Sequence, residues 1–381
     1  MKDKIQIIAV SSINKFKAKD WNNCNKNGNV FLSYNFLKLL EDSHSIGGNT
    51  GWQPIYFCLK INNKITAIVP SFIKYHSQGE FVFDHSWAQA YQSLGLNYYP
   101  KLLIASPFSP VTGKRILVTQ NVNDKIKKDL FNFIKDFCKE KKISSIHINF
   151  FEKHELDFLK REGFLIRYGE QFHFLNDNYN TFEDFLNKLS YKVRKSINKE
   201  RQSIKNQGIN IEIIKNEEFN ENLSKIMYQF YISTIEKKWS YNYLSEDFFI
   251  KLPQYLNKES ILILAKKNKN IIAGALNFIS NNILYGRYWG SNTDIKNLHF
   301  EVCYYQAMEL AIKSKYMKVE AGAQGAHKIK RGYLPKITYS AHFIFNEKLE
   351  FAIRNFLKEE RKIILNDINH INSNYSPYKT I

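Results

Sequence analysis

The sequence predicts an α/β protein made of two tandem domains with the same order of elements. Three observations support this prediction. The length of 381 residues suits two domains. Apolar runs of strand length alternate with segments of helical periodicity. The order β-α-β-β-β-α-β occurs twice, and a repeat of about 190 residues indicates a duplicated domain rather than a solenoid. We therefore expect domains at residues 1–178 and 179–345 with a cleft between them, and a C-terminal helix and tail at 346–381.

The first half begins with a strand within residues 1–10. The apolar side chains of Phe31, Tyr34, Leu37 and Leu40 recur at helical spacing, which predicts a helix over residues 31–41. The polar segment Asn62-Asn63-Lys64 separates two apolar runs, which is typical of a hairpin. The other expected elements are strand 115–118, helix 123–141, strand 145–150, helix 152–161 and strand 164–174, with the hairpin strands at 54–60 and 65–73.

The second half repeats this order and contains a second hairpin whose sequence can be aligned with the first. Its expected elements are strand 209–214, helix 220–237, hairpin strands 261–265 and 271–279, strand 283–289, helix 300–313 and strand 317–320. We expect a further helix at residues 347–368, packed on the core, and a loose tail at residues 373–381.

The composition is that of a folded protein, with 44% hydrophobic and 15% aromatic residues. The four cysteines are far apart and form no CxxC or Cys/His pair, so we expect reduced thiols and neither a disulfide framework nor a metal site. No apolar run reaches 18 residues, and the N-terminus does not resemble a signal peptide. The sequence therefore predicts a soluble cytoplasmic protein, with peripheral membrane contact left open.

The chain is strongly basic, with 55 Lys and Arg against 36 Asp and Glu, giving a formal net charge of +19. Such a charge favours polyanions such as tRNA, nucleotide-linked substrates or an anionic membrane surface. The Lys and Asn content is equally compatible with AT-rich coding, because the charge is diffuse. DNA is not an expected partner.

A basic helix is predicted at residues 190–206, between the two halves. Val193, Ile197 and Ile204 form a narrow apolar stripe, and Lys and Arg side chains cover the rest. Two interpretations remain open: a solvated helix that packs by its stripe, or an anion-binding helix on which Arg194 contacts phosphate.

The first stretch rich in rare residues covers residues 79–91 and 98–101. Glu80 and Asp84 are spaced to share one face of a helix, and aromatic side chains follow them. A packed aromatic subcore with surface acids is the simpler interpretation. The functional interpretation assigns substrate binding to Glu80, Asp84, Trp87, Tyr91 and Lys101.

The second stretch joins residues 285–290, 298–306 and 320–335. A strand-helix-strand arrangement places these three pieces side by side, and a general base must lie within hydrogen-bond reach of the group that it deprotonates. The catalytic candidates are His327, Glu320, Glu301 and His299. The substrate-binding candidates are Arg287, Trp289 and Gln324, and the donor-phosphate candidates are Lys328, Lys330 and Arg331. The alternative for Arg331 is a structural bridge to buried carboxylates.

The order of elements is similar to that of the GNAT acyltransferases, and residues 159–164 resemble their helix-to-strand junction, where Gly163 ends the helix. Neither residues 119–125 nor 291–300 contain the Arg/Gln-x-x-Gly-x-Gly/Ala turn with which GNAT enzymes hold the pyrophosphate of CoA. No GxxxxGK[ST], GxGxxG, HExxH or GxSxG motif is present.

Residues 51–54, 79–91, 98–101, 105–110, 285–290, 298–306 and 320–335 together resemble the FemAB-like, GNAT-type family labelled peptidoglycan biosynthesis/recognition. The likeness covers about residues 31–360. It implies tandem GNAT-like domains and an N-acyltransferase, although Ala326 stands where the family pattern has Glu. A more distant likeness to the aminoacyl-tRNA-dependent Fem transferases rests on residues 193–197 and 328–333.

The resemblance implies transfer of an acyl or aminoacyl group to an amine, with a peptidoglycan precursor as the acceptor. It implies no bound cofactor, and acyl-CoA or aminoacyl-tRNA as the donor co-substrate. The absent CoA turn and the net charge favour aminoacyl-tRNA. The alternative is a non-catalytic GNAT-like module that binds a polyanion, either tRNA or an anionic envelope precursor.

Overall fold

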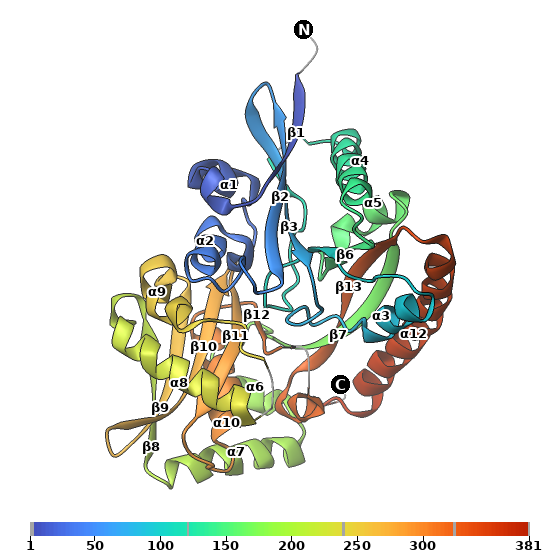
Figure 1. Cartoon of the computed structure of the whole chain (residues 1–381). Coiled ribbons are helices and arrows are strands. Elements are labelled where there is room, and N and C mark those ends of the chain that lie inside the picture. The colour runs from blue at the N-terminus through green and yellow to red at the C-terminus, as the bar shows by residue number, and fades with distance from the viewer. Residues whose placement is uncertain (1–3, 120–121, 238–240, 323–324, 380–381) are drawn as a thin grey trace. The chain divides into compact units, whose positions relative to one another are not determined.

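The computed structural model describes residues 4–119, 122–237, 241–322 and 325–379, and the chain divides into two compact α/β units. Unit 1 comprises residues 1–169 and 338–365, and unit 2 comprises residues 170–337 and 366–381 (Figure 1). The first division lies at 169/170, nine residues before the expected boundary at 178/179. Residues 338–345, which the sequence analysis places in the second domain, belong to unit 1.

Unit 1 contains a mixed sheet in the order β1-β2-β3-β4-β6-β13, with β5 paired to β3. Its strands are β1 (Ile5–Val10), β2 (Trp52–Ile61), β3 (Lys64–Lys74), β4 (Lys101–Ile104), β5 (Leu117–Val118), β6 (Ser145–Asn149) and the second part of β13 (Leu334–Ile344). Its helices are α1 (Ala18–Cys24), α2 (Tyr34–Asp42), α3 (His85–Ser93), α4 (Asp124–Glu140), α5 (Leu156–Arg161) and the first part of α12 (Glu347–Asn374).

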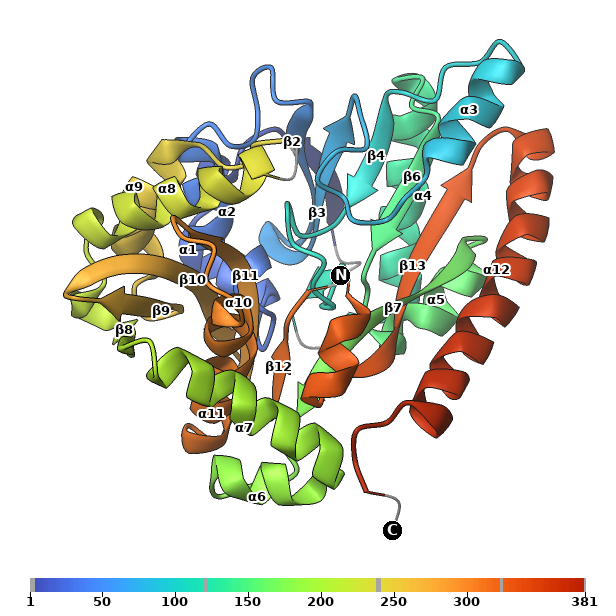
Figure 2. The same ribbon diagram turned by 90° about the horizontal axis from the view of Figure 1, so that it is seen from below.

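Helices cover both faces of the unit 1 sheet at β6. Ile146 and Ile148 face the core cluster that contains the buried side chains of α4 and α5. Ser145, His147 and Asn149 point to the opposite face because side chains alternate along a strand. On that face α3 and α12 pack together through Trp87 and Leu349, among others. Figure 2 shows α3 and α12 beside β13.

Unit 2 contains the sheet order β7-β12-β11-β10-β9-β8. Its strands are the second part of β7 (Leu165–Leu175), β8 (Ile209–Lys215), β9 (Ser260–Lys267), β10 (Asn270–Ser280), β11 (Ile283–Ser291) and β12 (Lys318–Glu320). Its helices are α6 (Phe182–Lys188), α7 (Tyr191–Lys205), α8 (Glu221–Lys237), α9 (Glu246–Leu256), α10 (Leu298–Phe300) and α11 (Gln306–Lys313). A π-helical turn at Glu301–Tyr305 connects α10 to α11, and a 3-10 helix, η6, covers Ala326–Arg331.

The hairpins that the sequence predicts are present in both units. Asn62 and Asn63 have φ values of 50° and 65° between β2 and β3, and Asn268 and Lys269 have φ values of 49° and 68° between β9 and β10. Two successive residues with positive φ give the turn that matches the twist of a two-residue hairpin, and Asn tolerates this conformation well.

The two units use the same pairing scheme. In unit 1 the parallel pair is β4–β6, and β13 pairs antiparallel with β6 from Ser340 to Ile344. In unit 2 the parallel pair is β11–β12, and β7 pairs antiparallel with β12. Strands β7 and β13 each span a division between the units. The last strand of each sheet therefore belongs to a segment that begins in the other half.

The C-terminal helix is confirmed, and α12 extends to Asn374, beyond the expected end at residue 368. The prediction of a loose tail is wrong for the described residues up to 379. The Ser190 amide donates to the carbonyl of Pro377, and the Lys379 amide donates to the carbonyl of Lys188. The Tyr378 hydroxyl donates to the carbonyl of Gly332 at 2.8 Å. Three hydrogen bonds thus hold the tail on unit 2.

Among the described residues, no helix combines the length and the apolar content needed to cross a bilayer.

Candidate functional site

Strands β11 and β12 diverge in unit 2. Their parallel pairing ends where Tyr285 faces Glu320, but β11 continues to Ser291. In the pairing of β11 with β10, Asn277 faces Gly286 and Leu276 faces Tyr288, so Arg287 is an extra, bulged residue. Bulges redirect side chains and are common beside active sites. The bulge therefore lies close to the last residues of β11.

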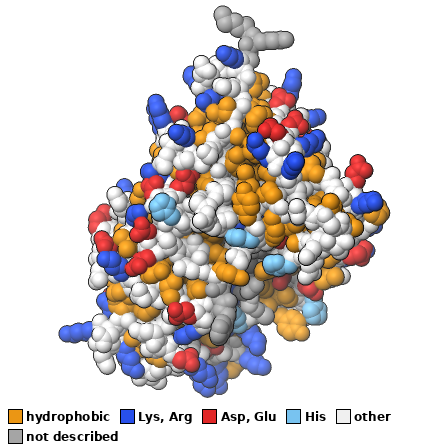
Figure 3. Space-filling view, viewed as in Figure 1, with side chains coloured by type: hydrophobic (Ala, Val, Ile, Leu, Met, Phe, Trp, Pro, Cys, Tyr) orange, Lys and Arg blue, Asp and Glu red, His pale blue; other side chains and the backbone are white. Residues whose placement is uncertain are grey.

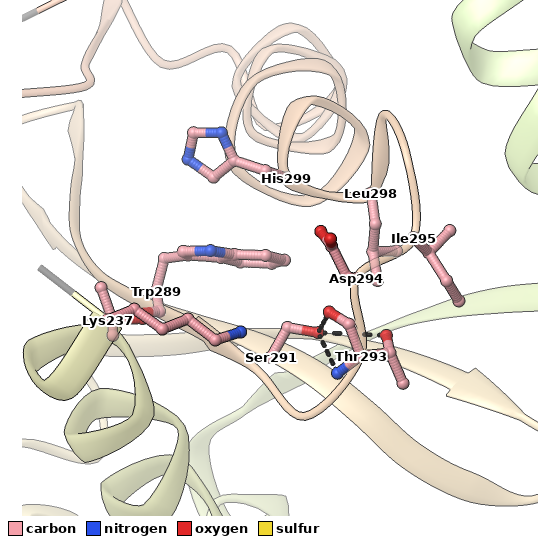
Figure 4. A pocket seen from close by; sticks show the side chains of 9 residues that line it. Lys237, Trp289, Ser291, Thr293, Asp294, Ile295, Leu298 and His299 are labelled. Atoms are coloured by element: carbon pink, nitrogen blue, oxygen red, sulfur yellow. Dashed lines mark hydrogen bonds between the residues drawn. The ribbon is translucent and has the colours of Figure 1, made fainter.

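A pocket of about 270 Å³ lies at this end of β11. Its lining comes from the end of α8, from β11, and from the loop that leads into α10: Thr234, Lys237, Trp289, Ser291, Thr293, Asp294, Ile295, Leu298 and His299. Figure 4 shows the Trp289 ring below His299, and the Lys237 side chain with its ammonium group directed toward Ser291. The pocket thus offers an indole ring, an imidazole ring, one cation, one carboxylate and three hydroxyl groups.

The close approach of α8 to β11 positions the pocket wall. A Cβ atom on Gly290 would lie 1.8 Å from the carbonyl oxygen of Phe230, so only glycine fits there. The Thr234 hydroxyl donates to the carbonyl of Trp289 at 2.7 Å. On the opposite wall, the Ser291 hydroxyl accepts from the Thr293 amide at 3.1 Å and donates to the carbonyl of Ile272 at 3.0 Å. These bonds fix the loop that carries Asp294.

His299 and His327 come together around Tyr304, as the sequence predicts for the two histidines. The Tyr304 hydroxyl and His327 Nε2 are 3.0 Å apart. The ring centroids of His299 and Tyr304 are 5.2 Å apart, and those of His299 and His327 are 6.3 Å apart. Burial raises the pKa of Tyr304, so this hydroxyl is protonated at neutral pH and can donate to His327. His327 itself is exposed.

Glu301 does not join the two histidines. Its carboxylate is buried, pairs with Arg201 at 3.1 Å, and accepts from the Gln306 side chain at 2.7 Å. It begins the π-helical turn at Glu301–Tyr305. Single π turns within α-helices are frequent at functional sites. We conclude that Glu301 supports the shape of the helix that presents His299 and Tyr304, rather than the chemistry.

Glu320 also lies apart from the histidine pair, in a buried cluster at the strand divergence. Lys318 Nζ is 2.7 Å from Glu320, and Arg287 Nη2 is 3.8 Å from it. Burial alone would raise the pKa of the Glu320 carboxyl, but His173, Lys318 and Arg287 hold it below its ordinary value. Burial lowers the pKa of His173 to about 4. A carboxylate held in its charged form is a weak base, which argues against Glu320 as the proton acceptor.

The four donor-phosphate candidates have different surroundings. Arg331 is buried, forms an ion pair with Glu200 at 2.8 Å, and lies 3.4 Å over the ring of Phe300. This ion pair is close to the structural alternative for Arg331, although Glu200 is a single, half-buried carboxylate. Lys328 is buried and donates to the carbonyl of Gly322 at 2.9 Å. Arg194 donates to the Asn187 side chain at 2.9 Å.

Lys330 differs from these three because it is exposed. Gln324 lies outside the described residues. Within the described part of the chain, no group of three His, Cys, Asp or Glu side chains is arranged to hold a metal ion.

The unit 1 candidates form a buried network and not an open site. Lys101 Nζ contacts Asp84 and lies 2.8 Å from Glu80, and the Tyr98 hydroxyl donates to Asp84 at 2.5 Å. Lys74 lies 3.9 Å from Glu80. The prediction that Glu80 and Asp84 share a helix face is wrong, because Glu80 lies in the preceding loop and Asp84 is the N-cap of α3.

Trp87 and Tyr91 are also buried, and they pack with α12 in the core. The simpler interpretation of a packed aromatic subcore is therefore the one that the structure favours, with the acids inside it.

The sequence alone does not single out several of the pocket residues. Thr234, Lys237, Ser291, Thr293 and Asp294 belong to no motif, and only the packing of α8 on β11 brings the first two to the loop. Tyr304 lay within the flagged stretch 298–306 but received no role. Its spacing from His299 was the available signal, because residues five apart across a π turn meet on one side of the helix.

Comparisons with known proteins agree with this architecture. A family model named FemAB-like, described as peptidoglycan biosynthesis/recognition, matches residues 12–380. The structure of FemX has 13% sequence identity and a TM-score of 0.56, and covers 92% of this chain and 100% of its own. The structure of L-PGS from Bacillus licheniformis has 11% identity and a TM-score of 0.52, and covers 84% of this chain and 94% of its own. At these identities the similarity is one of fold. No curated protein sequence matches the chain.

Proposed function

Because the chain belongs to the FemAB-like family of peptidoglycan biosynthesis/recognition, we propose that it transfers an aminoacyl group from an ester donor to an amine of a peptidoglycan precursor. The family and the α/β fold support a transferase related to peptidoglycan. The observation that carries the proposal is the Tyr304–His327 hydrogen bond of 3.0 Å, next to His299, which lines the pocket.

The reaction needs one proton to move. The amine nitrogen forms a bond to the acyl carbon, the ester C–O bond breaks, and the proton of the amine must reach the departing oxygen. In the tautomer with the proton on Nε2, the exposed His327 can accept the amine proton at Nδ1. Tyr304 can then pass its own proton to the departing oxygen and recover one from His327 Nε2. The hydrogen-bonded pair of Tyr304 and His327 can therefore move the proton from the amine to the departing oxygen.

The pocket favours an aminoacyl donor over a simple acyl donor. Asp294 offers a carboxylate to the α-ammonium group of an aminoacyl ester, which an acetyl group lacks. Lys237, Ser291 and Thr293 offer a cation and hydroxyl groups to phosphate and ribose oxygens. Trp289 offers a flat ring on which a base can stack.

A transfer assay tests the proposal. Labelled aminoacyl-tRNA and labelled acyl-CoA are each offered with a panel of amines that includes peptidoglycan precursors, and the amide product is followed by mass spectrometry. We expect product from aminoacyl-tRNA. His327→Ala should lower turnover by about 10²–10⁴-fold with donor affinity retained, because it removes the proton acceptor and no donor contact.

His370→Ala provides the control, since His370 is an exposed histidine on α12, outside the pocket. Equal turnover in wild type and His327→Ala would remove the catalytic role of the pair. Donor binding without product across the whole panel would instead identify the chain as a non-catalytic module that binds a polyanion.

A further inference from the structure

The outer face of α7 presents lysines that are free to bind a ligand. Lys192, Lys195 and Lys199 are exposed and follow the i, i+3, i+7 spacing that places them on one side of the helix. None of the described residues forms an ion pair with any of the three. Blue side chains gather in Figure 3 at the lower edge of the molecule, where Figure 1 places α7. A row of cations without partners is available to an external anion.

The inner face of the same helix is fixed to the segments that build the candidate site. Glu200 pairs with Arg331 of η6, and Arg201 pairs with Glu301 of the π-helical turn. The Asn297 side chain donates to the Ser203 hydroxyl at 3.1 Å, and Asn297 directly precedes the pocket residue Leu298. Glu200, the acid of α7, is thus used internally, while the outer lysines remain exposed.

The basic surface continues beyond the N-terminal end of α7. Lys188 and Lys379 are exposed, and their main chains are joined by the hydrogen bond that fixes the tail. The neighbouring acids Glu183 and Asp184 lie in the first turn of α6, whereas Lys188 ends it. Tyr191, at the first position of α7, is 68% exposed. Five lysines and one exposed aromatic ring therefore share this region of unit 2.

The side chains between the lysines indicate whether the anionic partner is a membrane surface or RNA. Ser196, Asn198 and Gln202 are exposed and polar, and the aliphatic residues Ile197 and Ile204 are buried in the core. A helix that inserts into a membrane surface needs an apolar exposed face, which α7 lacks. A cationic row with hydrogen-bonding side chains and a stacking ring is what single-stranded or stem RNA requires.

We propose that the outer face of α7 binds the phosphate backbone of RNA, with Lys192, Lys195 and Lys199 as the phosphate contacts and Tyr191 as a stacking platform. The inference rests on the proposed function, in which RNA carries the aminoacyl group. The three lysines span about 10 Å along the helix, which suits a strand with one charge about every 3.4 Å. Because α7 contacts the pocket loop, an RNA lying on it can direct its end into the pocket.

The test measures the affinity for uncharged tRNA over a range of salt concentrations. The variant carries Lys192→Ala, Lys195→Ala and Lys199→Ala. The control carries Lys125→Ala, Lys128→Ala and Lys160→Ala, which removes the same charge from exposed lysines of unit 1 that have no ion-pair partner among the described residues. For three lost phosphate contacts, the slope of log affinity against log salt should become shallower by about 2–3 in the α7 variant. The control should keep the wild-type slope.

Tyr191→Ala should lower affinity roughly 5- to 150-fold and leave the slope unchanged, because stacking involves no counterion release. Equal slopes in the two triple variants would overturn the proposal. So would an α7 variant that loses binding to anionic phospholipid vesicles but keeps its affinity for tRNA. Binding of uncharged tRNA does not depend on turnover. If the salt slopes differ as expected but no aminoacyl transfer is detected, the RNA-binding surface is supported and only the proposed reaction is rejected.

Discussion

The strands of units 1 and 2 pair in the same scheme, with one parallel pair in each unit: β4–β6 in unit 1 and β11–β12 in unit 2. The units differ at the ends of β4 and β11. In unit 1, β4 ends at Ile104, and the chain that follows is buried almost throughout residues 105–117. Arg115 fixes this segment by donating to the carbonyls of Asn149 and Val111, and Glu155 accepts from the Arg115 and Ile116 amides. In unit 2, the corresponding strand β11 carries the bulge at Arg287 and ends at the pocket.

The difference indicates how the two copies divide their roles. Unit 1 fills the space beside its parallel pair with its own chain and buries its charged groups in pairs. Unit 2 instead has a pocket at the end of β11 and an exposed histidine, His327. The polar residues of unit 1 should therefore govern stability, and those of unit 2 should govern ligand binding and turnover.

Removal of Lys101 should have the largest effect on stability. Lys101→Met leaves Asp84 and Glu80 buried without their main cation, and breaking one partner out of a buried ion pair costs about 3–5 kcal/mol. Urea unfolding measures this loss. Asp124→Asn is the comparison, because it breaks an ion pair to Arg161 at the surface and should cost less than about 1 kcal/mol. A stable Lys101→Met protein with weakened substrate binding would return Lys101 to the substrate-binding role.

The buried histidines of unit 1 should give a smaller effect that depends on pH. His147 and His342 share a hydrogen bond of 2.7 Å, and burial lowers the pKa of His147 to about 3. An unfolded histidine takes up a proton near pH 6.5. The unfolded state therefore binds the proton between pH 6.5 and 3 while the folded state does not, so the contribution of His147 to stability is lost as the pH falls through this range.

When the pH falls from 7 to 4.5, the unfolding free energy of the wild type should decrease by about 2–3 kcal/mol relative to that of His147→Gln. The rate is about 1.4 kcal/mol per pH unit below pH 6.5. The comparison with the variant is needed because Glu80, whose pKa burial raises to about 7, acts in the opposite direction over part of this range. His370→Gln, on the surface, should show no shift. A pH-independent difference for His147→Gln would contradict a neutral buried imidazole.

Arg331→Ala should cost about 2 kcal/mol, because a half-buried Glu200 loses its charged hydrogen bonds and Phe300 loses the guanidinium above it. Lys330→Ala, one residue earlier and exposed, should change the unfolding free energy by less than about 0.5 kcal/mol. Both variants are then titrated with donor. Weaker donor binding by Arg331→Ala at full stability would show that its cation serves a ligand.

The smallest effect on stability is expected for Lys237→Ala, within about 0.5 kcal/mol, because this side chain is exposed. Its donor affinity should nevertheless fall about tenfold through the loss of one charged hydrogen bond. Lys237→Arg should retain most of the affinity. An unchanged affinity in Lys237→Ala would mean that the donor does not use this wall of the pocket.

The sequence was sufficient for most helices and strands, because their signals are local. The period of the apolar residues, the Asn-rich turns and the Gly163 junction correctly predicted both hairpins and the helices α4 and α11. The pairing of β13 with β6 joins residues nearly 200 positions apart, and nothing in either segment specifies its partner. β13 is also not among the strands that the sequence predicts, and residues 338–345 are expected in the second domain although they belong to unit 1.

The proximity of His299 and His327 could be predicted because each lies in a conspicuous stretch beside a strand end. Their catalytic role stays a prediction. The i, i+4 spacing of Glu80 and Asp84 was misleading, since Phe81 has a φ of 59° and breaks any helix between them. The pairing of Arg331 with Glu200 depends on the docking of α7. A basic residue in a sequence does not reveal whether its charge is already neutralised.

Strands β7 and β13 each span a division between the units, which limits how the chain can be cut into two fragments. A polypeptide cut at 178/179 would leave the first fragment without the strand that pairs with β6, and would leave the second without the strand that pairs with β12. Each fragment alone would expose the edge of a buried strand. Produced together, the fragments carry complementary strands and can assemble as a split protein. Neither half can therefore be removed without taking away a strand that the sheet of the other unit uses.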